Sequence, residues 1–108
     1  MVVGDTCWVA GTTDPSGDHP GDPAGQARAA FGIVGRALDE AGFALADVVR
    51  TRMYVVDPAH ATSVAEVHGE IFGSIRPAST LVVVRALIEP QLLVEVEVDA
   101  RRSSQGSG

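Results

Sequence analysis

The apolar positions of this chain recur with two different periods, which together predict four strands and two helices. Stretches typical of strands are bounded by turn-forming residues, and they lie at 6–10, 48–56, 80–87 and 92–99. Helical spacing of apolar residues appears in two places, between Asp22 and Gly42 and between Asp57 and Gly73. The predicted order is therefore strand, helix, strand, helix, strand, strand.

Both helices have recognisable start signals, and the first has a clear stop. Asp22-Pro23 and Asp57-Pro58 each place an N-cap aspartate before a proline at the first helical position. Gly42 follows the first apolar stripe, where glycine readily ends a helix. Gly32 and Gly35 lie inside this helix, and each weakens it by up to about 1 kcal/mol relative to alanine. We therefore expect both to be compensated by close packing on the sheet.

This element order predicts a two-layer α+β fold. Right-handed crossovers place both helices on one face of a single mixed β-sheet. The last two strands are separated only by 88–91, which is short enough for a hairpin. Alternation along 48–56 assigns to the helix-covered face Val49, Thr51, Met53 and Val55. The uncovered face is expected to mix apolar and ionisable residues: Arg50, Arg52, Tyr54, Leu81, Val83, Leu93, Glu95 and Glu97.

Glu95 and Glu97 form the most informative pair on this face, because alternate residues of a strand point the same way. Neighbouring carboxylates are costly to cover without partners. They therefore mark either a salt-bridged subunit interface, in which arginines neutralise them, or a pocket. A mixed apolar and charged face of this kind is expected to be covered by self-association.

Composition narrows the possible functions. With 108 residues the chain forms one domain, expected at 1–102, followed by a flexible tail at 103–108. The net charge of −6 and the absence of lysine argue against nucleic acid and against Schiff-base chemistry. No apolar run reaches the ~18 residues of a membrane span. We see no secretory signal, and the lone Cys7 fits a reducing compartment, so we expect a cytoplasmic protein.

Several short segments keep a recognisable order and spacing. They are Trp8-Val9-Ala10-Gly11-Thr12, Gln26-Ala27-Arg28, Ala41-Gly42, the run from Asp47 to Asp57, Phe72 with Arg76-Pro77-Ala78, and Val94-Glu95-Val96-Glu97. Together they resemble the Rid family, also called YjgF/YER057c/UK114, over about residues 4–102.

The resemblance implies a chorismate-mutase-like α+β fold and a homotrimer whose sheets face a central barrel, with pockets between subunits. Well-known members hydrolyse reactive enamines and imines, such as those derived from 2-aminoacrylate, to 2-keto acids and ammonia. The implied partners are other copies of this chain and a small-molecule ligand, with no nucleic acid and no membrane. No cofactor is expected, and no cluster of His, Cys and Asp has the spacing of metal ligands.

Position by position, the resemblance also implies a site. Glu95 matches a last-strand glutamate that positions or activates water, and Gly11 matches the small residue beside the pocket. Ser79 stands where those members have an arginine that clamps the substrate carboxylate, and Leu81 stands where they often have cysteine. A hydroxyl cannot replace a bidentate guanidinium–carboxylate pair. Efficient hydrolysis of simple 2-imino acids is therefore not expected.

Each of these residues also has a structural interpretation. Glu95 is either a water-orienting base or a carboxylate paired with a neighbouring arginine. Ser79 either donates to a ligand oxygen or caps its own turn, and Arg76 either contacts an anionic ligand or is a solvated loop residue. His68 lies beside the buried stripe of the second helix, where a lone histidine usually has a structural role.

The sequence thus favours a Rid-like protein acting on small reactive enamines, imines or related carbonyl metabolites, as a hydrolytic deaminase. Two alternatives stay open: a non-catalytic trimer that binds a small metabolite, and a tailoring enzyme of a biosynthetic pathway.

Overall fold

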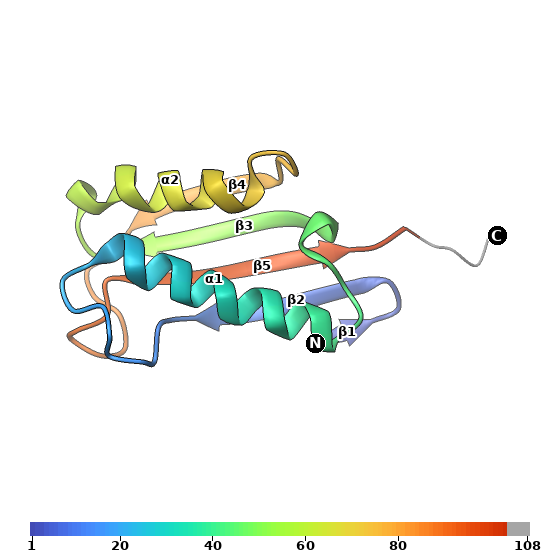
Figure 1. Ribbon diagram of the computed structural model, residues 1–108, viewed down its shortest axis with the longest axis horizontal. Helices are drawn as coiled ribbons and strands as arrows, with labels where there is room; N and C mark the ends of the chain where they lie inside the picture. The colour runs from blue at the N-terminus through green and yellow to red at the C-terminus, as the bar shows by residue number, and fades with distance from the viewer. Residues whose placement is uncertain (104–108) are drawn as a thin grey trace.

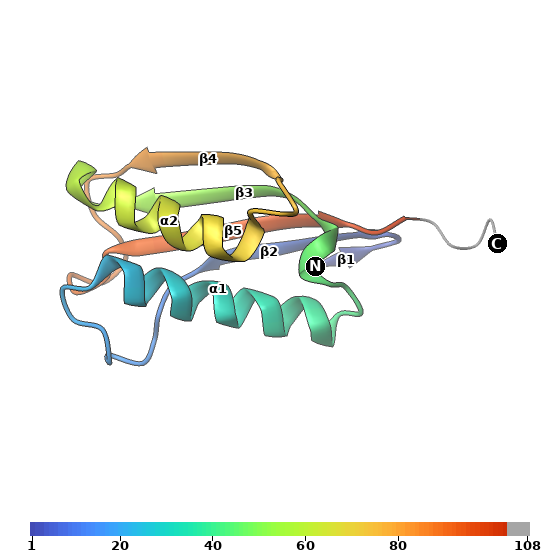
Figure 2. The same cartoon turned by 45° about the horizontal axis from the view of Figure 1, so that its top comes forward.

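A computed structural model describes residues 1–103 as one five-stranded sheet with two helices packed on one face (Figure 1). The strands are β1 (Val2–Val3), β2 (Thr6–Thr12), β3 (Val48–Val55), β4 (Ala78–Val83) and β5 (Val94–Arg101). The helices are α1 (Pro23–Glu40) and α2 (Ala61–Phe72), and two 3₁₀ turns are η1 (Leu45–Asp47) and η2 (Pro58–His60). Figure 2 shows both helices on the same side of the sheet, which confirms the predicted two-layer α+β fold. Of the predicted tail, residues 104–108 lie outside the described part.

The predicted boundaries of the first helix agree with α1, whereas α2 begins at Ala61, three residues after the predicted first helical position Pro58. The Asp22 side chain accepts a hydrogen bond from the Gly25 amide at 3.0 Å, and Gly42 adopts the left-handed conformation at φ +84° just beyond α1. Asp57 caps the short turn η2, which leads directly into α2.

The prediction that Gly32 and Gly35 pack closely on the sheet is wrong. A Cβ built on Gly32 would meet only Arg36 Nη1, at 3.8 Å, and one on Gly35 only Leu45 Cδ2, at 4.0 Å. Both glycines instead line an open groove between the helices and the chain that follows α1. The helix stability that these two glycines remove is therefore not compensated by contacts with the sheet.

The predicted hairpin between the last two strands is also wrong. The strand order is β1-β2-β5-β3-β4, so β5 lies between β2 and β3, while β4 lies at the edge and pairs parallel with β3. The central strand alternates fully buried side chains, at Val94, Val96, Val98 and Ala100, whereas Val82 and Val83 of β4 are 40% and 50% exposed. The strand with the continuous buried row therefore takes the centre of the sheet, where both neighbours satisfy its backbone.

Three residues change faces relative to the prediction. Leu81 and Val83 stand opposite the buried Met53 and Val55, so they point to the helix side and not to the open face. The β3–β5 register shifts between Val48 and Arg50, which buries Val48 and leaves Val49 half exposed. A local irregularity of this kind moves one residue off the alternating pattern.

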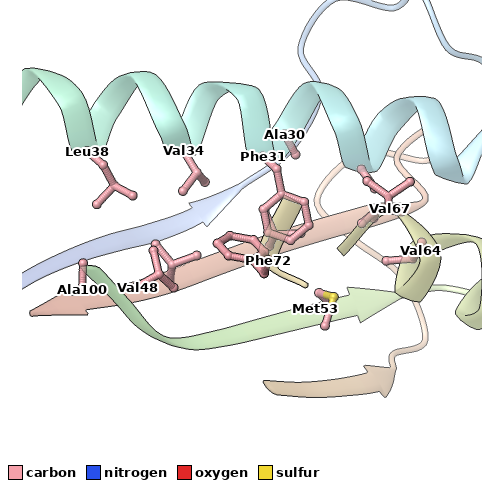
Figure 3. Packing of buried hydrophobic residues seen from close by; sticks show 14 of the residues in the cluster. Ala30, Phe31, Val34, Leu38, Val48, Met53, Val64, Val67, Phe72 and Ala100 are labelled. Carbon is pink, nitrogen blue, oxygen red and sulfur yellow. The ribbon is translucent and has the colours of Figure 1, made fainter. Parts of the chain in front are cut away.

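The core lies between the helices and the sheet. Figure 3 shows Ala30, Phe31, Val34 and Leu38 of α1 pointing toward the strands, and the rings of Phe31 and Phe72 meet edge to face with centroids 5.4 Å apart. The opposite face of the sheet carries no helix (Figure 2), and the candidate chemistry is divided between that face and the edge at β4.

Candidate functional site

Gly11 and Glu95 lie directly against each other on neighbouring strands, on the open face of the sheet. A Cβ added to Gly11 would overlap the Glu95 carboxylate oxygen and stand 2.9 Å from Glu95 Cδ. Gly11 falls where the β2–β5 register shifts, between Val9 and Thr12. The glycine therefore leaves the space in which this carboxylate rests, and the structure brings these two predicted site residues together.

Glu95 differs sharply from the carboxylates beside it on β5. The Tyr54 hydroxyl donates to Glu97, and Arg52 lies 3.9 Å from Glu97 and 3.4 Å from Asp99. Within residues 1–103, the half-buried Glu95 has no hydrogen-bond or ion-pair partner. The arginine-paired interpretation thus applies to Glu97 and Asp99, and Glu95 is left available to a ligand or to water.

The electrostatics of Tyr54 follow from this arrangement. Its hydrogen bond to Glu97, reinforced by burial, raises the pKa of the phenol above its usual value of 10.0. The phenol stays protonated because its proton is shared with a carboxylate. Glu97 is consequently committed to its neighbours, which supports a structural role for it.

Ser79 lies elsewhere, at the start of the edge strand β4 and on the helix side. Its hydroxyl is 2.8 Å from Thr51 Oγ1 on β3 and 3.2 Å from His68 Nε2 on α2. Thr51 Oγ1 is also 2.8 Å from His68 Nε2, so three polar side chains from three elements form a triangle. Leu81, two residues further along β4, points to the same side and is partly buried against the core.

His68 is held by aromatic side chains. Its ring packs 4.8 Å from Phe72 and 6.0 Å from Phe31, measured between centroids. Burial lowers the pKa of the imidazole below its usual value of 6.5, so the ring is neutral near pH 7. The sequence alone did not identify the contact to Thr51. A hydroxyl on an otherwise apolar strand face was the available signal.

Arg76 lies in the tight turn between α2 and β4. Its backbone has φ +58°, an uncommon conformation for a residue with a side chain, and its amide donates to Phe72 O at 2.8 Å. The side chain is exposed and has no hydrogen-bond or ion-pair partner among residues 1–103. The turn orients the chain so that Ser79 enters the sheet beside His68.

The predicted site residues therefore form two separate groups in one chain. Ser79 stands opposite Thr51 of β3, and Glu95 stands opposite Tyr54 of the same strand. Thr51 and Tyr54 are three residues apart, so the two groups are separated by about 10 Å along β3. Their side chains also lie on opposite faces of the sheet. A single chain does not bring Ser79 and Glu95 into one pocket.

The grooves of the single chain lie away from these residues. One of about 890 Å³ is lined by α1, the end of α2 and residues 43–45, and two others, of about 380 and 270 Å³, lie beside the loop that contains Asp14 and His19. None of these three is lined by Gly11, Ser79 or Glu95. The candidate chemistry of these three residues therefore lies on open surfaces of the single chain and not inside these grooves.

Two further features concern the described residues alone. Residues 1–103 contain no group of three or more His, Cys, Asp or Glu side chains placed to hold a metal ion. None of the helices in this part of the chain is both long enough and apolar enough to cross a membrane.

This protein is a small two-layer α+β protein, because two helices cover one face of a mixed sheet. On the open face, a glutamate that is unpaired within residues 1–103, Glu95, lies against a strand glycine, Gly11. The chain belongs to the Endoribonuclease L-PSP family, whose model matches residues 1–102 and whose members include the YjgF/YER057c/UK114 proteins. The resemblance found in the sequence is thereby confirmed, and membership supports an action on small molecules.

Individual relatives agree with this assignment. The protein SCO2049 of Streptomyces coelicolor is 39% identical over 110 residues, covering 99% of this chain and 82% of its own. The crystal structure of Rv2704 from Mycobacterium tuberculosis is 50% identical with a TM-score of 0.87, covering 94% of this chain and 82% of that one. E. coli TdcF, solved with bound serine, shares the fold at 23% identity and a TM-score of 0.85, over 95% and 85% of the two chains.

Proposed function

We propose that this protein is a hydrolytic deaminase of the Rid type, acting on small enamines, imines or related carbonyl metabolites. The observation that carries the proposal is the free Glu95 carboxylate, placed against Gly11 beside carboxylates that are already paired. A carboxylate without a partner can hold a water molecule and accept its proton. This residue is therefore assigned as the catalytic base.

The step balances with water alone. The water oxygen adds to the imine carbon while one proton passes to Glu95 Oε2, and the same proton is then delivered to the nitrogen. The hydroxyl of the resulting carbinolamine then gives its proton to the nitrogen, again through Glu95, while the C–N bond breaks and the carbonyl forms, so the products are a ketone or keto acid and ammonia. No metal or redox partner is needed to balance this reaction.

The working assembly in this proposal is a homotrimer with pockets between subunits. Support comes from the division of the site: Glu95 with Gly11 on the open face, and Ser79 with Leu81 on the helix side of the edge strand. A neighbouring chain that packs at the edge strand can bring its own Glu95 to Ser79. The uncovered sheet face, which carries Trp8 at 43% exposure among paired charges, offers a surface for that contact.

The substrate in this proposal does not depend on a carboxylate clamp, because Ser79 stands at the clamp position. The test measures ammonia release from 2-iminobutanoate and from an imine without a carboxylate, both generated in situ, with and without protein. We expect acceleration mainly for the second substrate. Replacing Ser79 with arginine (S79R) should then raise activity on 2-iminobutanoate.

The variant that tests the base is Glu95→Gln, with Glu97→Gln as its matched control on the same strand and face. General-base catalysis contributes about 10²–10⁴-fold, so E95Q should lose that much turnover and E97Q should keep most of its activity. Unchanged turnover in E95Q would overturn the assigned role.

The second candidate is a trimer that binds a metabolite without turnover, which the missing clamp favours. Saturable binding of a small ketone together with no acceleration of any imine would select it. A role as a tailoring enzyme predicts turnover on larger carbonyl substrates. RNA cleavage is disfavoured by the net charge of −6 and the absence of lysine.

A further inference from the structure

The triangle formed by Thr51, His68 and Ser79 has a chemistry of its own. It joins β3, α2 and β4 through contacts of 2.8, 2.8 and 3.2 Å, and Ser79 is the member exposed to solvent. Thr51 is fully buried, so its hydroxyl must be satisfied by these neighbours. Of the three side chains, Ser79 therefore presents an accessible hydroxyl, and the buried Thr51 supports it from below the surface.

The Ser79 hydroxyl has spare hydrogen-bonding capacity. Thr51 Oγ1 donates its one hydrogen to Ser79 Oγ, so His68 Nε2, 2.8 Å from Thr51 Oγ1, donates to Thr51 and does not accept from Ser79. The Ser79 hydrogen is then within reach of the Pro77 carbonyl at 3.1 Å, which exceeds the 2.7–2.8 Å typical of O–H···O hydrogen bonds. An incoming acceptor on the exposed side can therefore take that hydrogen at little cost.

The two side chains that contact the Ser79 hydroxyl, Thr51 and His68, are uncharged near pH 7. His68, packed between Phe31 and Phe72, is neutral near pH 7 because burial lowers its pKa. Arg50 on the neighbouring strand β3 donates to Thr80 at 2.5 Å, and Thr80 points to the opposite face of β4. In the intersubunit pocket of the proposed trimer, a carboxylate held against Ser79 would lose its hydration without gaining a cation from the side chains that contact Ser79, which is costly.

We propose that Ser79, positioned by His68 and Thr51, binds an uncharged oxygen of the ligand, which makes neutral carbonyl compounds and their imines the substrate class. A carboxamide, ketone or hydroxyl group would occupy the place next to Ser79. The proposal rests on the proposed function, since it assigns the ligand end of that same site. His68 is a positioning residue, because it acts through the Ser79 hydroxyl.

The test uses two ligands of nearly equal size that differ in charge, 2-oxobutanamide and 2-oxobutanoate, titrated into the full chain at pH 7.5. We expect the amide to bind at least about tenfold more tightly, as one unpaired buried charge would require. Ser79→Ala should weaken amide binding about 2- to 10-fold, the value of one neutral hydrogen bond, and leave 2-oxobutanoate unchanged. Ser79→Arg should reverse the preference.

His68 is tested by the amide-to-acid affinity ratio, which a purely structural role would not change. His68→Gln keeps a polar nitrogen near the ring Nε2 position and should retain most of the preference, whereas His68→Leu should abolish it. Arg76→Gln controls for the exposed arginine three residues before Ser79. If the wild type binds 2-oxobutanoate and R76Q loses it, Arg76 is the anion site and the proposal is wrong.

The remaining outcomes separate this inference from the proposed function. Equal or tighter binding of 2-oxobutanoate by the wild type overturns the inference, even if imines are still hydrolysed. Imine hydrolysis that is insensitive to Ser79→Ala, with no amide binding, also overturns it and leaves the deaminase assignment intact. No binding of either ligand and no turnover of any imine would remove both.

Discussion

Replacing Gly11 with alanine should reduce turnover strongly while leaving stability almost unchanged. The added Cβ would stand 2.9 Å from Glu95 Cδ, where ordinary contact begins at about 3.4 Å, so the carboxylate group must move by at least about 0.5 Å. The atoms that move are the end of a flexible side chain, so the backbone is expected to stay in place.

The expected magnitudes follow from this displacement. A misplacement approaching 1 Å costs about 10²-fold in rate, which corresponds to about 2.7 kcal/mol of transition-state stabilisation. A shifted Glu95 rotamer costs about 0.5–1.5 kcal/mol of stability, and alanine returns about 0.5–1 kcal/mol relative to glycine. The two stability effects nearly cancel.

The assay combines ammonia release from the preferred imine with thermal unfolding of Gly11→Ala, Glu95→Gln and the double variant. If Gly11 acts only through Glu95, the double variant should be no slower than E95Q alone. Wild-type turnover in G11A would refute this reasoning, and so would fully additive losses in the double variant.

Three further predictions concern single side chains. Tyr54 is the single tyrosine, so its absorbance titration should report a pKa above 10.0, and Glu97→Gln should lower it because the dominant hydrogen bond is lost. The protein should become less stable to denaturant as pH falls below 6.5, because burial lowers the pKa of His68 and the unfolded chain therefore binds a proton at this residue before the folded chain does. In H68Q this pH dependence should flatten between pH 6.5 and 4.5, since the lowered pKa values of Asp14 and Glu70 affect stability only below pH 3.8 and 4.5. Gly69→Ala in α2 should raise stability by about 0.5–1 kcal/mol, since its Cβ would meet nothing within 4 Å; a lowered melting temperature would contradict this.

The helices were predictable because their signals are local. Asp22, Pro23 and Gly42 act within one turn of the helix end that they define, so the sequence contains all that is needed. The position of β4 was not predictable in this way. Proximity in the chain favoured a hairpin with β5, whereas burial of the β5 row placed that strand in the centre.

In the candidate site, too, only some of the features could be predicted from the sequence. The family resemblance assigned Gly11 and Glu95 to the site one by one, and the structure adds that the two are in direct contact, because a glycine leaves room for the carboxylate. The contact of Ser79 with Thr51 and His68 joins residues 28 and 11 positions away, and only the parallel pairing of β3 with β4 brings them together. Alternation alone had assigned Leu81 to the wrong face for the same reason.

The placement of Glu95 and Ser79 on opposite faces has a consequence for mixed assemblies. In the proposed trimer each chain lends its glutamate to one neighbour and its Ser79 to the other, so two differently inactivated chains complement each other. A trimer made only of Glu95→Gln chains is inactive, and so is one made only of chains blocked by Ser79→Trp. In a mixed trimer, a complete site forms at each interface where the first chain supplies Ser79 and the second supplies Glu95. Random co-assembly in equal amounts should restore about a quarter of the wild-type sites.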